Sequence, residues 1–577
     1  MALPPLLVFG PRSLTYDFGP AHPLTPRRFG PAIDLLRLLG AEPGLEPEPA
    51  SDDELLICHS ARYVETVKRL SELDYDPWGA PEAGIGPGDD PPFAGMHDAA
   101  AAVAGGSLRA MEAILSGATL HAFHPGGGLH HAMPSRASGF CVYNDPALAI
   151  AKARQAGLRV LYIDLDVHHG DGVQEIHWDD PGVLTVSFHE SGRYLFPGTG
   201  SVAEVGDGPA AGSVVNVPFE PGTGERAWLS AVEMLLPELA AAFGPDIVVS
   251  QHGCDTHASD PLAHLNVTTT AMGAAARLVD AIAHRWAGGR WLATGGGGYG
   301  VYRVVPRAWA NVWLAGAHRD VPDRLPAEWR DRWADEAARY GDRSLPEAFD
   351  DPTNAGLPFD AEQRDAETRS LATAALSREV SVPRLIREAV DRGWWSPLGT
   401  PLAAREDSPT SGSTVGRPEI LDSVDRQTLD RLTLAPRLVA NLDPALLRDM
   451  LVSQALSLTI AVDGATAVGL VVSALDDPAA ADPAAGRSVL AVGVAPAWRR
   501  QALATRMLAA HVETFGQAGT PWSATVTLAE RDPVEPLDRA LRSTIAARLY
   551  ERAGFGREEP DRRLRLVDPG ALRFVRR

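Results

Sequence analysis

Apolar runs that alternate with helical stretches are the feature that most constrains the fold of roughly the first 320 residues. Stretches with helical spacing span residues 224–243 and 268–286. The runs typical of buried strands are 159–163, 183–187, 246–250 and 290–293. Strands that alternate with helices build parallel sheets with helices packed on the faces, so the pattern predicts an α/β fold.

The chain has 577 residues, which is more than a single domain usually contains. After the α/β pattern, from about residue 320, the sequence becomes rich in Asp, Glu, Arg, Trp and Pro. This region ends in a polar stretch at 405–415. A smaller set of strand-like runs follows at 458–462, 467–472 and 489–492. We therefore expect three parts: a first domain with a C-terminal extension at 1–380, a linker region at 381–417, and a second domain at 418–577.

Charge and cysteine usage narrow the choice of partners. A net charge of −21 argues against nucleic acid, because binding it depends on neutralising phosphates. The three cysteines, Cys58, Cys141 and Cys254, are too few and too scattered for a disulfide framework, which fits the cytoplasm. Residues 1–9 read as a first strand rather than a signal peptide, and no apolar run is long enough for a membrane span. The oligomeric state is left open.

Polar residues follow four of the predicted strands. Asp164, Asp166 and His168 come at the end of strand 159–163, and alternation along a strand places them on one face. The other three strand ends carry the pair His130-His131, then Asp255, and a glycine run with Tyr299. Sites in open parallel sheets form outside the carboxyl ends of the strands. Carboxylates and imidazole suit a zinc ion with one open position.

Seven segments over residues 8–318 carry a family resemblance: 16–23, 128–132, 137–141, 143–145, 164–172, 196–200 and 295–299. They resemble the zinc-dependent histone-deacetylase superfamily, and within it the bacterial acetoin-utilisation-type members. The resemblance implies an arginase/deacetylase-type open parallel sheet with helices on both faces.

The resemblance also implies roles for individual residues. Zinc would be held by Asp166, His168 and Asp255. Two adjacent histidines, His130 and His131, would act in proton transfer, oriented by Asp164 and Asp171 respectively, and Tyr299 would supply a hydroxyl to the reacting carbonyl. A potassium ion beside this site would be bound by backbone around Asp164–His168, with Ser187 and Phe188.

A substrate channel is implied as well. Its walls would be Phe140 and Phe196, its floor Gly139, and its rim Asp89, which would hold substrate backbone. In the family, the residue after an Asp-Pro pair helps to gate the channel, and here that residue is Leu262. An apolar gate favours acyl-lysine over acetylpolyamines, whose second amine is cationic.

The function implied is zinc-dependent hydrolysis of acetyl or other acyl groups from lysine side chains of proteins, releasing acetate. Two alternatives remain open: an acetylpolyamine deacetylase, and another arginase-fold amidohydrolase. Enzymes of the latter kind usually assemble two manganese ions with further Asp pairs. No second Asp-x-Asp or Asp-x-His run ends a strand here, which favours one metal.

A strand-like run at 489–494 leads into residues 495–504 and a helical run to 512, and a second segment follows at 547–555. In these segments, residues 418–577 resemble the GNAT acetyltransferase superfamily. The resemblance implies that acetyl-CoA binds where a strand passes into a helix, at the residues Val494, Arg499, Arg500, Gln501, Ala502 and Ala504. A helix N-terminus there would hold the pyrophosphate. Tyr550, in a second signature, would protonate the leaving thiolate.

Ala502 departs from the GNAT pattern, which usually has glycine at this position. Alanine adds a methyl group and disfavours positive φ, so tight acetyl-CoA binding is in question. The second domain is therefore either an N-acetyltransferase, which would give the protein a second activity, or a non-catalytic acetyl-CoA sensor. The polar linker favours a tether over rigid coupling, so we expect residues 1–380 alone to deacetylate peptides.

Overall fold

The computed structural model describes residues 5–391 and, beyond them, the segments 419–421, 433–434, 456–463, 466–475, 487–494, 503–515, 522–526, 556–558 and 572–576. The chain divides into two compact units, Met1–Glu388 and Ala389–Arg577.

The first unit is built on a sheet of eight parallel strands in the order β2-β1-β3-β8-β7-β4-β5-β6. Their bounds are β1 Leu6–Val8, β2 Pro43–Leu45, β3 His121–His124, β4 Val160–Asp164, β5 Val183–Glu190, β6 Val214–Phe219, β7 Ile247–Gln251 and β8 Trp291–Thr294. The central strands are buried along their whole length. The prediction of an open parallel sheet is confirmed.

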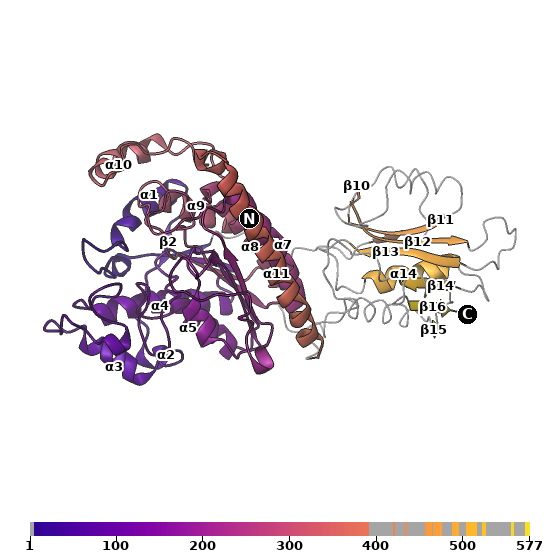
Figure 1. The fold of residues 1–577 in the computed structure, drawn as a ribbon, viewed down its shortest axis with the longest axis horizontal. Helices are drawn as coiled ribbons and strands as arrows, with labels where there is room; N and C mark the ends of the chain where they lie inside the picture. The colour runs from indigo at the N-terminus through magenta and orange to yellow at the C-terminus, as the bar shows by residue number, and fades with distance from the viewer. Residues whose placement is uncertain are drawn as a thin grey trace. The chain divides into compact units, whose positions relative to one another are not determined.

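Helices cover both faces of this sheet (Figure 1). α4 (Met96–Leu115) and α5 (Asp145–Gln155) pack on one face, and α7 (Glu225–Phe243), α8 (Thr269–Trp286) and α9 (Val305–Gly316) on the other. The other helices of the unit are α1 Phe29–Leu38, α2 Asp52–Leu55, α3 Ala61–Arg69, α6 Asp171–Ile176 and α10 Ala327–Arg339, with 3₁₀ turns at Pro11–Leu14, Pro26–Arg28, Pro81–Ala83, Gly208–Ala210 and Thr353–Gly356.

Local chemistry explains why the helices start where they do. The predicted ranges 224–243 and 268–286 begin one residue early, because Gly224 and Thr268 are N-caps. The Thr268 side chain accepts a hydrogen bond from the backbone N–H of Ala271, which satisfies one of the free donors of the first turn.

The four central strands end in one row. His124 of β3 pairs with Thr294 of β8, Thr294 pairs with Gln251 of β7, and Gln251 pairs with Asp164 of β4. The loops that leave these four strands therefore start side by side at one edge of the sheet, although β3, β4, β7 and β8 follow one another in a different order along the chain. We call this the carboxyl edge.

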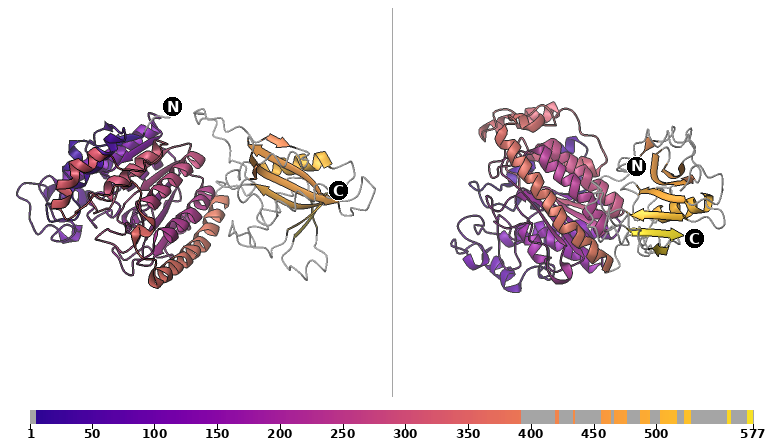
Figure 2. Two further views of the ribbon diagram at one scale, coloured as in Figure 1. Left: turned by 90° about the horizontal axis from the view of Figure 1, so that it is seen from above. Right: turned by 45° about the vertical axis from the view of Figure 1, so that its right-hand side comes forward.

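The unit closes with a long helix, α11 (Ala361–Asp391), which lies along α7 (Figure 2). Arg378 of α11 forms a paired salt bridge with Glu238 of α7, at 2.5 and 2.8 Å. The helix continues past residue 381, where we predicted the linker to begin. The physical reason is burial at helical spacing of Val382, Leu385 and Ile386.

The second unit contains one mixed sheet in the order β15-β16-β14-β13-β12-β11-β9, with β10 beside β12. Its elements are β9 Glu419–Leu421, β10 Thr433–Leu434, β11 Leu456–Asp463, β12 Thr466–Leu475, β13 Arg487–Val494, α14 Leu503–Phe515, β14 Trp522–Val526, β15 Gly556–Glu558 and β16 Leu572–Arg576. The three predicted strands fall within β11, β12 and β13.

Val494 ends β13 and Ala504 lies in the first turn of α14. The other residues predicted to bind acetyl-CoA lie outside the described residues: Arg499, Arg500, Gln501, Ala502 and Tyr550. The polar stretch 405–415 lies outside them as well.

Two further findings bear on the sequence expectations. All three cysteines are buried and unpaired. In the parts of the chain that the structure describes, every helix is too short or too polar to cross a bilayer.

Candidate metal centre and active site

Three potential metal ligands converge at the carboxyl edge. Nδ1 of His168 lies 3.1 Å from Oδ1 of Asp166 and 3.1 Å from Oδ2 of Asp255. All three side chains are buried or nearly so, and their ligand atoms lie within 4.8 Å of one another. The loops after β4 and β7 supply them, as the sequence predicted.

The surrounding backbone and one amide hold both carboxylates in place. Asp166 accepts hydrogen bonds from the Gln251 side chain at 2.7 Å and from the backbone N–H of Gly297 at 2.9 Å. Asp255 accepts one from the backbone N–H of Val167 at 2.9 Å. These bonds fix the carboxylate orientations, as the partners of metal ligands usually do. We did not single out Gln251 from the sequence, although it is the last residue of a strand that leads to a ligand.

The chemistry of this trio fits a zinc ion. Burial alone would lower the pKa of His168, but hydrogen bonds and charge attraction from Asp166 and Asp255 outweigh it and raise that pKa to about 10. Two carboxylates enclosed this closely require a compensating positive charge. One imidazole and two carboxylates with room for a further ligand are a set typical of catalytic zinc.

The predicted histidine pair stands beside the trio, with ring centroids 4.0 Å apart. His130 Nδ1 lies 2.8 Å from Asp164, and His131 Nδ1 lies 2.6 Å from Asp171. A carboxylate can only accept, so in each ring Nδ1 carries hydrogen and Nε2 faces away from the aspartate. The Nε2 atom of His130 lies 3.9 Å from Asp166, on the side of the metal ligands.

The two histidines have opposite pKa shifts. Burial lowers the pKa of His130, but Asp164 and Asp166 outweigh it and raise that pKa to about 9. Burial and the charge of His130 lower the pKa of His131 to about 4. Asp164 also accepts a hydrogen bond from the hydroxyl of Tyr162 at 2.6 Å. Tyr162 was not predicted, although it lies two residues before Asp164 and so shares its face of the strand.

Tyr299 approaches the same place from the loop after β8. The Asp260 carboxylate accepts a hydrogen bond from the Tyr299 backbone N–H at 2.9 Å. Burial, and then the charges of Asp255 and Asp166, raise the pKa of the Tyr299 hydroxyl, which keeps it protonated. Sterics explain a glycine in the run before Tyr299, because a Cβ atom at Gly297 would collide with the Asp255 carboxylate.

A cavity of about 220 Å³ opens onto these groups. Asp164 and Asp171 lie behind the histidines, and all the other residues predicted to hold zinc, to take part in catalysis or to form the channel line the cavity: His130, His131, Asp166, His168, Asp255, Tyr299, Asp89, Gly139, Phe140, Phe196 and Leu262. The structure thus brings residues from six loops to one cavity.

The residues predicted as floor and walls of the channel pack against the rings of His131 and Tyr299. Gly139 has φ 55°, and a Cβ atom there would lie 2.5 Å from the His131 ring. Phe140 also has positive φ. Its ring meets the Tyr299 ring edge-on, with the ring centroids 6.1 Å apart. Phe196 meets the His131 ring edge-on at 5.0 Å and is 41% exposed, so it reaches the mouth of the cavity.

Arg28 also lines the cavity, and nothing in the sequence singled it out. It is 4% exposed, and its guanidinium donates a hydrogen bond to the carbonyl of Gly296 at 2.7 Å. Burial lowers its pKa. The run Pro26-Arg27-Arg28 looks like surface, so the inward direction of Arg28 came only from the structure.

A family comparison agrees with this geometry. Residues 22–315 match the model of the histone deacetylase domain, and that range is half of the chain. The chain belongs to this family, and it is therefore a hydrolase of the deacetylase class whose fold implies a zinc cofactor.

Individual relatives agree as well. The chain is 40% identical to the acetoin utilization protein AcuC of Bacillus subtilis (strain 168) over 382 residues, which are 65% of this chain and 98% of that relative. It is 38% identical to AcuC of Staphylococcus aureus (strain MSSA476) over 60% of this chain and 90% of that one.

Solved structures give the same result. The crystal structure of an HDAC homolog complexed with SAHA matches with a TM-score of 0.56 and 30% identity. The crystal structure of an HDAC homolog from Aquifex aeolicus matches with a TM-score of 0.55 and 29% identity. Each match includes the whole of the solved chain and 64% of this chain.

Proposed function

We propose that the first unit is a zinc-dependent lysine deacetylase that acts on acetylated proteins and releases acetate. One observation carries the proposal: two buried histidines, each hydrogen-bonded to its own aspartate, lie beside a trio of potential metal ligands, and all five side chains line one cavity. Acyl transfer to water needs a base, an electrophile and a place for the oxyanion, and this arrangement has a candidate for each.

Asp166, His168 and Asp255 would hold the zinc, which supplies Lewis acidity toward the acyl oxygen and toward water. His131 takes a proton from the attacking water as the new C–O bond forms. The Tyr299 hydroxyl donates a hydrogen bond to the developing oxyanion. When the C–N bond breaks, a histidine of the pair returns a proton to the amine, and acetate and lysine leave. A potassium ion near Asp164 remains a prediction.

The cavity lining supports lysine as the amine. Leu24, Leu195 and Leu262 line it together with Phe140 and Phe196, which suits the four methylenes of a lysine side chain. Leu262 bears no charge that would attract the second amine of an acetylpolyamine. Asp89 is exposed at the mouth, where it can meet the backbone of a substrate.

The test is a panel of acetyl-lysine peptides and acetylpolyamines, assayed with zinc-loaded full-length protein. We expect a higher kcat/KM for at least one acetyl-lysine peptide than for every polyamine. Leu262→Glu should shift the preference toward polyamines, and Leu262→Met is the matched control that keeps an apolar gate. A higher kcat/KM of the unaltered protein for acetylspermidine than for any peptide would refute the proposed substrate class.

The arginase-type alternative is less well supported. Arginase-like chemistry requires two ions side by side, and the group at the carboxyl edge has three members, enough for one ion with an open position. Hydrolysis of a guanidino compound with two manganese ions bound at this edge would favour the alternative.

We propose a second function for the other unit, the binding of acetyl-CoA by a GNAT-like fold. In support, β13 and β14 are parallel neighbours, and α14 lies between them in the chain. Such a helix starts at the carboxyl end of its strand, where a pyrophosphate can bind. Single-turnover acetyl transfer to an amine would identify a transferase, and saturable binding without transfer a sensor.

A further inference from the structure

A second group of metal-binding side chains lies at the opposite edge of the sheet. His121 is the first residue of β3, whereas the proposed zinc site follows the last residues of the central strands. Asp280 and His284 lie one turn apart near the end of α8, and His318 follows the end of α9. We call these four residues the amino-edge cluster. No part of the deacetylase chemistry uses them.

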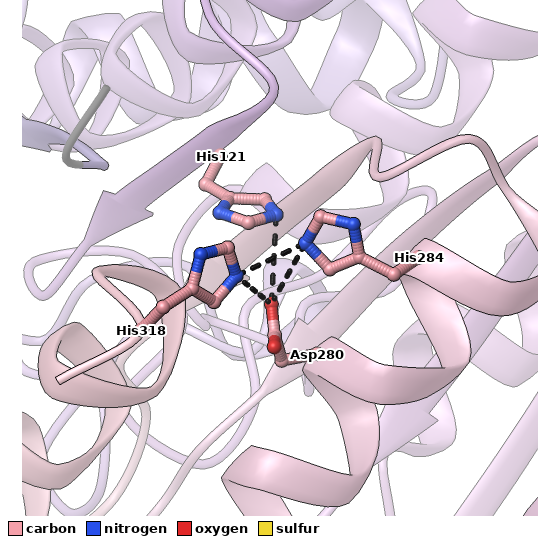
Figure 3. A group of neighbouring side chains, drawn as sticks. All are labelled: His121, Asp280, His284 and His318. Carbon is pink, nitrogen blue, oxygen red and sulfur yellow. Dashed lines mark hydrogen bonds and ion pairs between the residues drawn. The ribbon is translucent and has the colours of Figure 1, made fainter. Parts of the chain in front are cut away.

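The ligand atoms of the cluster face one another (Figure 3). The Nε2 atoms of all three histidines approach one oxygen of Asp280, at 3.5 Å for His121, 3.5 Å for His284 and 3.3 Å for His318. The Nε2 atoms of His284 and His318 are 3.0 Å apart. A tetrahedral zinc ion with bonds of ~2.0–2.1 Å holds its ligand atoms about 3.3–3.4 Å apart. These four separations, from 3.0 to 3.5 Å, fall around that value.

His121 supplies an independent observation. Its side chain is 5% exposed, and its Nε2 atom has no hydrogen-bond partner among the described residues. Its Nδ1 atom lies 2.9 Å from the carbonyl oxygen of Gly316. A carbonyl can only accept, so the hydrogen sits on Nδ1, and Nε2 presents a lone pair to the cluster. This is the arrangement found in metal-bound histidines, whose other nitrogen donates to a carbonyl or carboxylate.

The pair His284 and His318 is compatible with a bound ion. Their Nε2 atoms lie 3.0 Å apart, and both approach Asp280. In the absence of an ion, one of these nitrogens carries hydrogen and donates it to the other ring or to the carboxylate, and a cation would take the place of that hydrogen. His284 is half-exposed, as is His318, so an ion can enter from solvent. Four protein ligands leave no open position for a substrate, which is typical of structural rather than catalytic zinc.

We propose that the amino edge of the sheet carries a second, structural zinc site formed by His121, Asp280, His284 and His318. A bound ion there joins β3, α8 and the segment after α9, which are far apart in sequence. The proposal does not depend on the proposed deacetylase function.

The test is a zinc count on tag-free full-length protein, after equilibration with zinc and removal of unbound metal. We expect two zinc ions per chain. The double variant His284→Ala/His318→Ala should keep one ion, with its kcat/KM within about twofold at saturating zinc. Asp255→Ala should also keep one ion, and the three substitutions together should leave none.

His264→Ala is the matched control, because His264 is also exposed and paired with a carboxylate, Glu190, at 2.8 Å. It should keep two ions. Cobalt added to Asp255→Ala protein should give the strong visible absorption of a tetrahedral site, and His284→Ala/His318→Ala should abolish it. An unchanged zinc count in the double variant, or a weak octahedral cobalt spectrum, would overturn the proposal.

Discussion

The trio at the carboxyl edge and the amino-edge cluster lie at opposite ends of the same parallel strands and differ in composition and surroundings. The trio has two carboxylates and one histidine, is enclosed, and opens onto a cavity of about 220 Å³. The amino-edge cluster has three histidines and one carboxylate, and two of its four members are half-exposed. The sheet thus carries a group of potential metal ligands at each of these two edges.

The two groups differ in the number of coordination positions that would remain free around a bound ion. In the proposed function, three protein ligands leave a position for water or substrate beside the histidine pair and Tyr299, which would use it for hydrolysis. Four protein ligands close the coordination shell, so the second ion contributes only binding energy to the folded state. The carboxyl edge gathers loops, whereas the amino-edge cluster joins a strand start to two helix ends.

The largest effect should come from removing a ligand of the trio. Asp255→Ala in the His284→Ala/His318→Ala background should lose its remaining zinc and all deacetylase activity, because a histidine and one carboxylate cannot hold the ion. Zinc content and acetyl-lysine peptide hydrolysis measure this. Residual zinc-dependent turnover would mean that the reacting metal lies elsewhere.

Next in size is the loss of the tyrosine hydroxyl. Tyr299→Phe should lower kcat by about 10²–10³, the usual cost of one oxyanion donor, with the zinc count unchanged. Tyr302→Phe is a control, because Tyr302 is buried nearby in the chain but its hydroxyl binds Glu336 at 2.7 Å. Full activity in Tyr299→Phe would remove Tyr299 from the mechanism.

A smaller effect is expected from the amide that supports the trio. Gln251→Ala should weaken zinc binding or activity by about 10–100-fold, because Asp166 loses a hydrogen bond that orients it. Excess zinc should restore part of the activity. Zinc titration in the His284→Ala/His318→Ala background isolates this site, and an unchanged affinity there would contradict the supporting role.

The amino-edge cluster should affect stability rather than turnover. Zinc should raise the Tm of Asp255→Ala protein by a few degrees, since an ion that binds only the folded state stabilises it. The same measurement on Asp255→Ala/His284→Ala/His318→Ala should show no zinc-dependent shift. Equal shifts in both proteins would place the stabilising ion outside this cluster.

The smallest effect concerns the second unit. Both clusters lie before residue 319, so a chain ending at Asp391 should keep the kcat/KM of the full-length protein on short peptides. A chain ending at 380 should be less stable, because it loses Leu385 and Ile386 from the buried face of α11. Acetyl-CoA should change the full-length rate little, and a tenfold change would show that the two units are coupled.

Much of the fold could be read from the sequence, because local periodicity encodes it. The strands predicted at 159–163 and 246–250 and the helix at 268–286 lie within one residue of those observed. The helix α11 was not predicted, because its sequence is rich in charged residues and the apolar spacing of Val382, Leu385 and Ile386 is interrupted by Pro383. Tyr162 was also missed, because a strand tyrosine is usually core.

The sequence alone determined which chemically reactive side chains follow the carboxyl ends of the strands, because each motif is short and contiguous. Only the tertiary structure decided that β3, β8, β7 and β4 are neighbours, and so that the four motifs share one cavity. It alone brought together His121, Asp280, His284 and His318. The physical reason is that the hydrogen bonds between strands and the packing of helices set distances between segments that no local pattern records.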